Sequence, residues 1–233
     1  MATLTAANFL ARLRALRSPG DAEKIRRFIR DEQSRKVLGV AHGKIFQLAK
    51  EFTATPLGEV EKLLDSPYYE ARMGAVSIMD FQARARSTIV ADRKQLFELY
   101  VRRHDRINNW DLVDRAAPHV VGRYLLDQPR DVLYQLARSA DPWERRTAIV
   151  STAWFIREGQ VDDTFRIAAL LVEDPDDLVQ KAIGSWVREA GKKDSKRLIA
   201  FLDEYQSRMS RTALRYATEK LPAAVRARFL QAK

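Results

Sequence analysis

The sequence predicts an all-α protein, and three observations support that fold class. Apolar residues recur at helical spacing along nearly the whole chain, and no stretch of useful length alternates apolar and polar residues as a strand would. The chain has only 9 Gly and 8 Pro, which is few for a fold with many tight turns. Its dominant residues are Ala, Leu, Arg, Glu and Lys, which favour helices.

The expected helices follow one another with short breaks. The first carries an apolar stripe over residues 9–16 and is closed by Pro19-Gly20, and the second runs from residue 21 to about residue 37. The inward-facing residues of the second helix are expected to be Ile25, Phe28 and Ile29. Breaks such as Thr55-Pro56 and Asp174-Pro175 then separate helices expected over residues 42–53, 57–65, 68–85, 90–104, 112–126, 130–139, 142–157, 161–172, 175–191, 194–206 and 209–220.

Several of these segments resemble one another: a basic residue near the helix start precedes a small residue and an aliphatic one. The basic positions are 43, 31, 35 and 30 residues apart and are Arg72, Arg115, Arg146, Lys181 and Arg211. This spacing is typical of two-helix repeats stacked into a solenoid, in which small residues let neighbouring helices approach closely. We expect a single helical-repeat domain over residues 1–233, with divergent helices over about 1–40 and repeats over about 41–222.

The repeated basic residues have two interpretations. They are either a row of solvated surface charges or a set of phosphate-binding groups. The helix dipole disfavours cations at helix N-terminal turns, and a bound phosphate would offset that cost. The chain has 41 Lys and Arg against 31 Asp and Glu, a formal charge of +10. Such an excess usually marks a nucleic-acid or anionic-surface partner, and charge alone does not separate that interpretation from an incidentally basic protein.

Composition also excludes some kinds of site. Cysteine is absent, which rules out disulfides and thiolate metal sites and favours a reducing, cytoplasmic compartment. The three histidines, His42, His104 and His119, lack metal-ligand spacing, so we expect no metal and no cofactor. No apolar run approaches the length of a membrane span, and the Arg-rich residues 1–20 are interpreted as a first helix rather than a transit peptide. We expect a monomer.

The most informative segment for function is INNWDLVD, residues 107–114. Trp110 and Asp114 are four residues apart, so on a helix both side chains face the same groove. An aromatic ring beside a carboxylate favours a cationic ligand or a cationic transition state, whereas a basic protein attracts a polyanion. Nucleic acid with a cationic, damaged base satisfies both. In the alternative interpretation Trp110 is a core aromatic and Asp114 pairs with a nearby arginine. Asp111 is expected to be a helix-start acid.

Four segments, taken in order, resemble the AlkD-like DNA alkylation repair family, DNA glycosylases built from HEAT-like repeats. They are residues 107–114, WERRTAIV at 143–150, KAIGSWVREAGK at 181–192 and RTALRYATE at 211–219, and the resemblance covers about residues 60–222. The resemblance implies a HEAT-like solenoid whose basic concave groove binds double-stranded DNA. A protein bound in this way is expected to be associated with the nucleoid.

The resemblance also implies roles for individual residues. Asp114 is expected to be catalytic, and Trp110 to line the lesion site. Ser185 stands where the family has a second lesion-facing tryptophan, with Trp186 as the next residue, and Phe28 matches a family tyrosine. The expected phosphate-binding residues are Arg146, Lys181, Arg72, Arg211 and Arg188, although Arg188 could instead pair with Glu189.

The chemistry leads to the same function. Alkylation at purine N3 or N7 makes the base cationic and weakens its glycosidic bond, and a carboxylate stabilises the oxocarbenium-like sugar that base departure leaves. We expect a glycosylase that excises such purines from duplex DNA. One alternative is a non-catalytic HEAT-repeat protein that binds unusual DNA structures, which Ser185 favours. A second is a helical-repeat scaffold for another protein.

Overall fold

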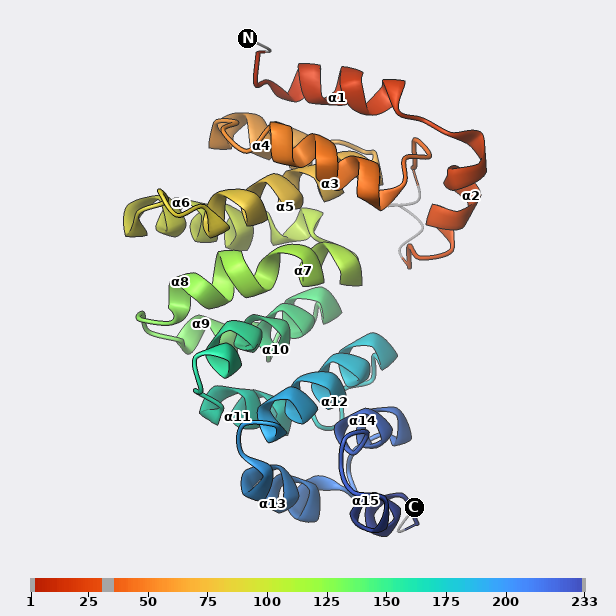
Figure 1. The fold of residues 1–233 in the computed structure, drawn as a ribbon, viewed down its shortest axis with the longest axis vertical. Helices are drawn as coiled ribbons and strands as arrows, with labels where there is room; N and C mark the ends of the chain where they lie inside the picture. Colours follow the sequence, from red (N-terminus) through yellow and green to blue (C-terminus); the bar gives the residue numbers. More distant parts are fainter. Residues whose placement is uncertain (1–2, 31–35, 232–233) are drawn as a thin grey trace. The chain divides into compact units, whose positions relative to one another are not determined.

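The computed structural model describes residues 3–30 and 36–231, and it is all-α, as predicted: no strand occurs within those residues (Figure 1). The chain divides into two compact units, residues 1–124 and 125–233, and each is described by itself. A single repeat domain over the whole chain stays a prediction.

In the first unit, helices pack around one central helix, α5. Its elements are α1 (Ala6–Ala15), α2 (Pro19–Arg26), α3 (His42–Glu51), α4 (Leu57–Leu64), α5 (Tyr69–Arg84), α6 (Val90–Arg102), the 3-10 turn η2 (His104–Arg106), α7 (Trp110–Ala116) and the π-helical η3 (Ala117–Gly122). The short α8 (Arg123–Leu125) continues η3.

Helix α5 is buried on every side over most of its length, because α3, α4, α7 and η3 all pack against it. Gly74 permits one of its closest contacts. A Cβ at Gly74 would lie 2.4 Å from the Phe9 ring of α1, so a larger residue would force the helices apart. The prediction that small residues allow close helix contact is confirmed at this position.

The buried carboxylate of Glu70 organises the loop before α3. It accepts hydrogen bonds from the backbone N–H groups of Leu38 (2.9 Å), Gly39 (2.8 Å) and Val40 (3.3 Å). Gly39 has φ of 87°, which a residue with a side chain rarely adopts. This loop places His42 at the start of α3.

Arg72 corrects one prediction. The residue is 2% exposed, and its guanidinium donates to the carbonyl oxygens of Ser66 (3.2 Å) and Pro67 (3.4 Å). The side chain therefore ties α5 to the preceding turn. A guanidinium with so little exposed surface is not placed to meet a DNA phosphate, so Arg72 is not a phosphate-binding residue in this arrangement.

The second unit has α12 at its centre, in contact with α10, α11, α13 and α14. Its further elements are α9 (Asp131–Leu136), α10 (Pro142–Arg157), α11 (Asp162–Leu170), α12 (Asp177–Gly191), α13 (Ser195–Tyr205), α14 (Arg211–Ala217) and α15 (Ala223–Gln231). A Cβ at Gly184 would lie 2.4 Å from the Ala213 carbonyl oxygen, so this glycine allows α12 and α14 their close approach.

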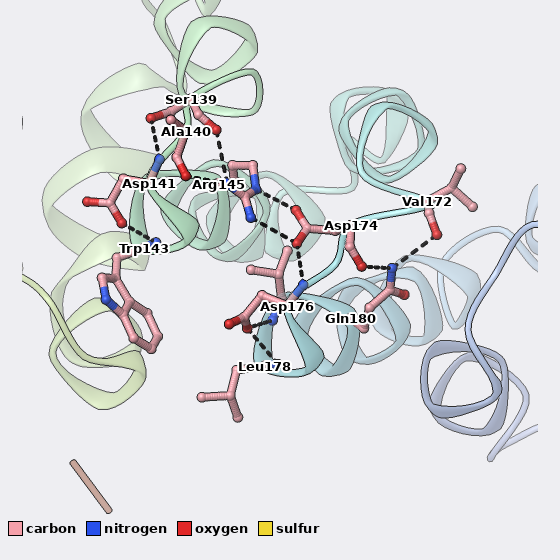
Figure 2. A network of polar contacts seen from close by, with 11 residues as sticks. Ser139, Ala140, Asp141, Trp143, Arg145, Val172, Asp174, Asp176, Leu178 and Gln180 are labelled. Atoms are coloured by element: carbon pink, nitrogen blue, oxygen red, sulfur yellow. Dashed lines mark hydrogen bonds and ion pairs between the residues drawn. The ribbon is translucent and has the colours of Figure 1, made fainter. Parts of the chain in front are cut away.

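Polar contacts join the starts of α10 and α12 (Figure 2). Arg145 binds both carboxylate oxygens of Asp174, at 2.5 and 3.0 Å, and donates to the carbonyls of Ser139 and Ala140. Asp141 caps α10 through the Trp143 N–H. Asp176 caps α12 in the same way. The cap of α10 is therefore the aspartate of an Asp-Pro pair, whereas the cap of α12 follows the Asp174-Pro175 pair, whose aspartate binds Arg145 instead.

Most predicted helices agree with the structure to within a few residues, and the second is the main exception. It ends at Arg26 rather than near residue 37. Residues 31–35 lie outside the described part of the chain, and residues 36–41 form a loop in which Glu70 binds the N–H groups of Leu38, Gly39 and Val40. Ile25 and Ile29 are buried as predicted, whereas Phe28 is 53% exposed.

Two further differences concern proline. Helix α15 was not predicted, because Pro222 suggested a helix stop, whereas this proline directly precedes the first residue of α15. The helix predicted over 112–126 begins earlier, at Trp110, and becomes π-helical at Ala117. Pro118 explains the change, since proline has no N–H to donate and its ring clashes with the carbonyl four residues back.

Candidate active site

A cavity of about 500 Å³ in the first unit brings three of the predicted site residues together. Phe28, Trp110 and Asp114 all line it. The other lining residues come from α3, α5, α7 and η3 and are His42, Phe46, Met73, Asp80, Asp111, Arg115, Pro118 and His119. The spacing argument that placed Trp110 and Asp114 on one helix face is therefore confirmed.

Asn109 connects two walls of the cavity. It precedes α7, is fully buried, and donates through Nδ2 to the Phe28 carbonyl oxygen at 3.3 Å. Its Oδ1 accepts from the Arg30 N–H, also at 3.3 Å. The Trp110 indole Nε1 donates to the same Phe28 carbonyl at 3.3 Å. These bonds hold the exposed Phe28 ring and the Trp110 ring at the rim of one cavity.

The Asp111 carboxylate is held by neutral donors. The Tyr69 hydroxyl donates to Asp111 Oδ2 at 2.5 Å, and Asn109 Nδ2 donates to Oδ1 at 2.7 Å. Burial, followed by the charge of Asp111, raises the pKa of the Tyr69 phenol well above its ordinary value. Tyr69 therefore stays protonated, and Asp111 is more than the helix-start acid that the sequence predicted.

His42 completes this group of polar side chains. Its Nε2 lies 2.7 Å from the Tyr69 hydroxyl oxygen and 3.5 Å from Asp111 Oδ2. Since Tyr69 gives its only proton to Asp111, the hydroxyl can only accept from His42, which requires a proton on Nε2. Nothing in the sequence around His42 or Tyr69 indicated this contact, because the two residues and Asp111 lie on three different helices.

Asp80 is a second buried carboxylate of the cavity wall, and it is paired with two basic side chains. It is 1% exposed at its side chain, with Arg115 Nη2 at 2.9 Å and His119 Nδ1 at 2.7 Å. The Arg115 guanidinium lies 4.6 Å from the Phe46 ring centre and 4.8 Å from that of Phe81. Burial lowers the pKa of Arg115, while the charge of Asp80 opposes that shift. Arg115 therefore pairs with Asp80, and Asp114 is an exposed residue of the cavity.

The lining favours a flat cation. Three carboxylates but only one arginine are among the lining residues, and the aromatic side chains are Phe28, Phe46 and Trp110. Aromatic faces and excess negative charge both attract a cation. A neutral base could stack on the rings but would gain nothing from the negative charge, and an anion would be repelled by it.

The remaining predicted residues belong to the second unit. Ser185 and Trp186 are half-buried neighbours on α12, and their lesion-facing role stays a prediction. Arg146 is 7% exposed and donates to the Leu178 carbonyl.

Three predicted phosphate-binding residues of this unit are more accessible. Lys181 is half-buried and Arg211 is exposed. The expected local pair is confirmed, because Arg188 Nε lies 3.1 Å from Glu189 Oε1, and Arg188 also pairs with Glu219.

No group of three or more potential ligands among His, Cys, Asp and Glu is arranged to hold a metal ion in residues 3–30 and 36–231. Over the same residues, every helix is too short or too polar to cross a membrane.

Comparison with known proteins gives one family. The family model described as "DNA alkylation repair enzyme" matches residues 9–221, which is most of the 233-residue chain. No curated protein is significantly similar to the chain.

Proposed function

We propose, from the premise that this chain belongs to the DNA alkylation repair enzyme family, that it is a DNA glycosylase. Its substrates are N3- and N7-alkylated purines in double-stranded DNA, which it releases by hydrolysis of the glycosidic bond. We further propose that it acts as a monomer in the cytoplasm, on nucleoid DNA.

One observation carries the proposal: the family's chemistry needs a cation-binding surface, and the described cavity has the matching composition. An N3- or N7-alkylated purine is a flat cation. The rings of Phe28 and Trp110 offer faces for it, each worth about 0.5–2 kcal/mol as a cation–π contact. The carboxylates of Asp111 and Asp114 add electrostatic attraction.

The proposed reaction needs no general acid. The bond between the sugar C1′ and the base nitrogen breaks, and its electron pair neutralises the positive charge of the departing base. The sugar becomes oxocarbenium-like, and water adds at C1′ with loss of a proton. Asp114 stabilises the sugar cation and orients the water. A neutral base carries no positive charge to accept this electron pair and is a poorer leaving group. Unmodified DNA is therefore expected to react poorly.

Asp111 has a different role from Asp114. Two donors, Tyr69 and Asn109, already hold its carboxylate, which fixes its position and its charge. We assign it to attraction of the cationic base rather than to bond breaking. The division follows from exposure, because Asp114 is exposed whereas the Asp111 side chain is 12% exposed.

The net charge of +10 supports binding to the DNA backbone. We propose Lys181, Arg211 and Arg188 as phosphate contacts. Arg146 is proposed on the family resemblance alone, because it is 7% exposed and its guanidinium already donates to the Leu178 carbonyl, so it would have to exchange that bond for a phosphate. These contacts set the position of the protein on DNA without reading its sequence.

A second candidate function is a non-catalytic protein that binds unusual DNA structures. Ser185 favours it, because a serine offers no aromatic face where the family has a tryptophan. The lesion-side residues Trp110 and Asp114 favour the glycosylase.

One experiment separates the two functions. Duplex DNA containing N7-methylguanine is incubated with the wild type, with Asp114→Asn and with Asp105→Asn, and released base is measured. Asp105 is a matched control, since its side chain is 64% exposed and it does not line the cavity. We expect Asp114→Asn to lower release on the order of 100-fold with unchanged DNA affinity, because the charge acts mainly in the transition state. No release by the wild type would exclude the glycosylase, and equal release by Asp114→Asn would remove Asp114 from the mechanism.

A further inference from the structure

A second cavity, of about 280 Å³, lies in the second unit and is basic. Its lining residues are Arg211, Thr212, Arg215, Arg226 and Leu230. Three of the five carry a guanidinium, and no carboxylate is among them.

The spacing of these residues on α14 and α15 explains why the three arginines line one cavity. Arg211 and Arg215 are separated by one helical turn on α14, so their side chains leave the same face. Arg226 and Leu230 have the same spacing on α15, which packs against α14. Like charges one turn apart destabilise a helix. An anion in the cavity would offset that repulsion.

The other arginines of this unit show that the cluster is unusual. Seven of them pair with acids in the described structure: Arg130, Arg145, Arg157, Arg188, Arg197, Arg208 and Arg228. Within residues 125–231, no acidic partner is recorded for Arg211, Arg215 or Arg226. The Arg226 Nε is also buried without a hydrogen-bond partner among the described residues. The Arg215 guanidinium lies 5.7 Å from the centre of the Tyr216 ring.

We infer that this arginine cavity binds a phosphate group of the DNA backbone, at a site separate from the lesion cavity. Guanidinium groups bind phosphate oxygens in pairs of parallel hydrogen bonds, and the Thr212 hydroxyl supplies a further donor. The cavity is lined on one side by Leu230, which would shield these bonds from water. This inference rests on the proposed function, because it takes duplex DNA as the source of the phosphate. It adds Arg215 and Arg226 to the residues that bind DNA.

The test measures binding to an undamaged, fluorescently labelled duplex between 50 and 200 mM KCl. The variant is Arg215→Gln/Arg226→Gln. The matched control is Arg208→Gln/Arg228→Gln, which removes the same charge from two arginines of the same unit that are 51% and 55% exposed and paired with acids. Thermal melting confirms that both proteins fold.

The expected result is a difference in salt dependence. Loss of one phosphate contact makes the slope of log affinity against log salt concentration shallower by about 0.9. Between 50 and 200 mM salt, the factor by which the affinity of the variant falls should therefore be roughly threefold smaller than the factor for the wild type. The control should keep the slope of the wild type. Equal slopes for the variant and the wild type would overturn the inference.

Two further measurements distinguish failure of this inference from failure of the proposed glycosylase function. Inorganic phosphate is titrated while the arginine Nε–H signals are followed by NMR: phosphate binding without a change in DNA slope would overturn the DNA assignment. Base release from methylated duplex DNA is measured for the wild type alone. A wild type that binds duplex but releases no base would contradict the glycosylase proposal while leaving this inference intact.

Discussion

The Tyr69 hydroxyl donates a 2.5 Å hydrogen bond to Asp111 Oδ2 and thereby joins α5 to α7 at the wall of the lesion cavity. The bond involves a fully buried tyrosine and a carboxylate whose side chain is 12% exposed. His42 donates to the same hydroxyl, so three helices meet at one oxygen atom. This arrangement fixes the position of one carboxylate, whereas Asp114 lies one turn further along α7 and is exposed.

Tyr69→Phe should destabilise the protein, because Asp111 loses a donor and His42 loses its acceptor. The expected cost is about 1–3 kcal/mol in the free energy of unfolding. The measurement is urea unfolding at pH 8. Tyr100→Phe, at a tyrosine that is also fully buried but outside the cavity, serves as a comparison. A cost no larger than that of the comparison would mean that the network contributes little.

The same variant should change how stability depends on alkaline pH. The folded protein keeps the Tyr69 proton because its pKa is raised, whereas the unfolded chain loses it near pH 10. The unfolded state then binds fewer protons, so the free energy of unfolding of the wild type falls as the pH rises past 10. Tyr69→Phe lacks this contribution, so its stability should fall less steeply between pH 9 and pH 11. Parallel curves would contradict the raised pKa.

Phe28→Ala should weaken recognition of the lesion without affecting the fold. The ring is 53% exposed, so its removal costs little stability, and its backbone carbonyl still accepts from Trp110. Loss of one cation–π contact should lower excision of N7-methylguanine by roughly 2- to 30-fold. Ile89→Ala is the control, since Ile89 is 62% exposed and lies outside the cavity. Unchanged excision by Phe28→Ala would remove this ring from the site.

Ser185→Trp tests whether an aromatic residue is missing from the second unit. If the lesion needs the aromatic face that the family supplies at this position, the variant should raise excision several-fold, equivalent to about 1 kcal/mol. If Trp186 already supplies that face, Trp186→Ala should abolish excision instead, and Ser185→Trp should lower it by crowding. Melting temperatures check that both variants fold. Unchanged excision by both would show that neither residue contacts the lesion.

Arg145→Ala should be strongly destabilising. Asp174 is 1% exposed and would be left buried without its cationic partner, at a cost of about 3–5 kcal/mol in the free energy of unfolding. Arg208→Ala breaks an exposed pair with Glu173 and should leave stability nearly unchanged. Denaturant unfolding of both variants checks the contrast, and equal effects would show that burial does not set the strength of these pairs.

The sequence by itself was sufficient for the features that depend on local backbone geometry. Helical periodicity predicted most of the helices, and a separation of four residues placed Trp110 and Asp114 in one cavity. The small residues Gly74 and Gly184 marked close helix contacts, because only a missing Cβ permits that distance. Each of these properties follows from repeat distances along one helix or from the size of one residue.

Only the tertiary structure decided which side chains are buried and which partners they have. His42, Tyr69 and Asp111 are far apart in the chain and meet because α3, α5 and α7 pack together. Arg72 and Arg211 looked alike in the repeat pattern, yet one is buried against carbonyl groups and the other is exposed. The second helix ends at Arg26, well before the loop whose N–H groups Glu70 binds. Burial and partner choice depend on long-range packing, which the spacing of residues along the chain does not specify.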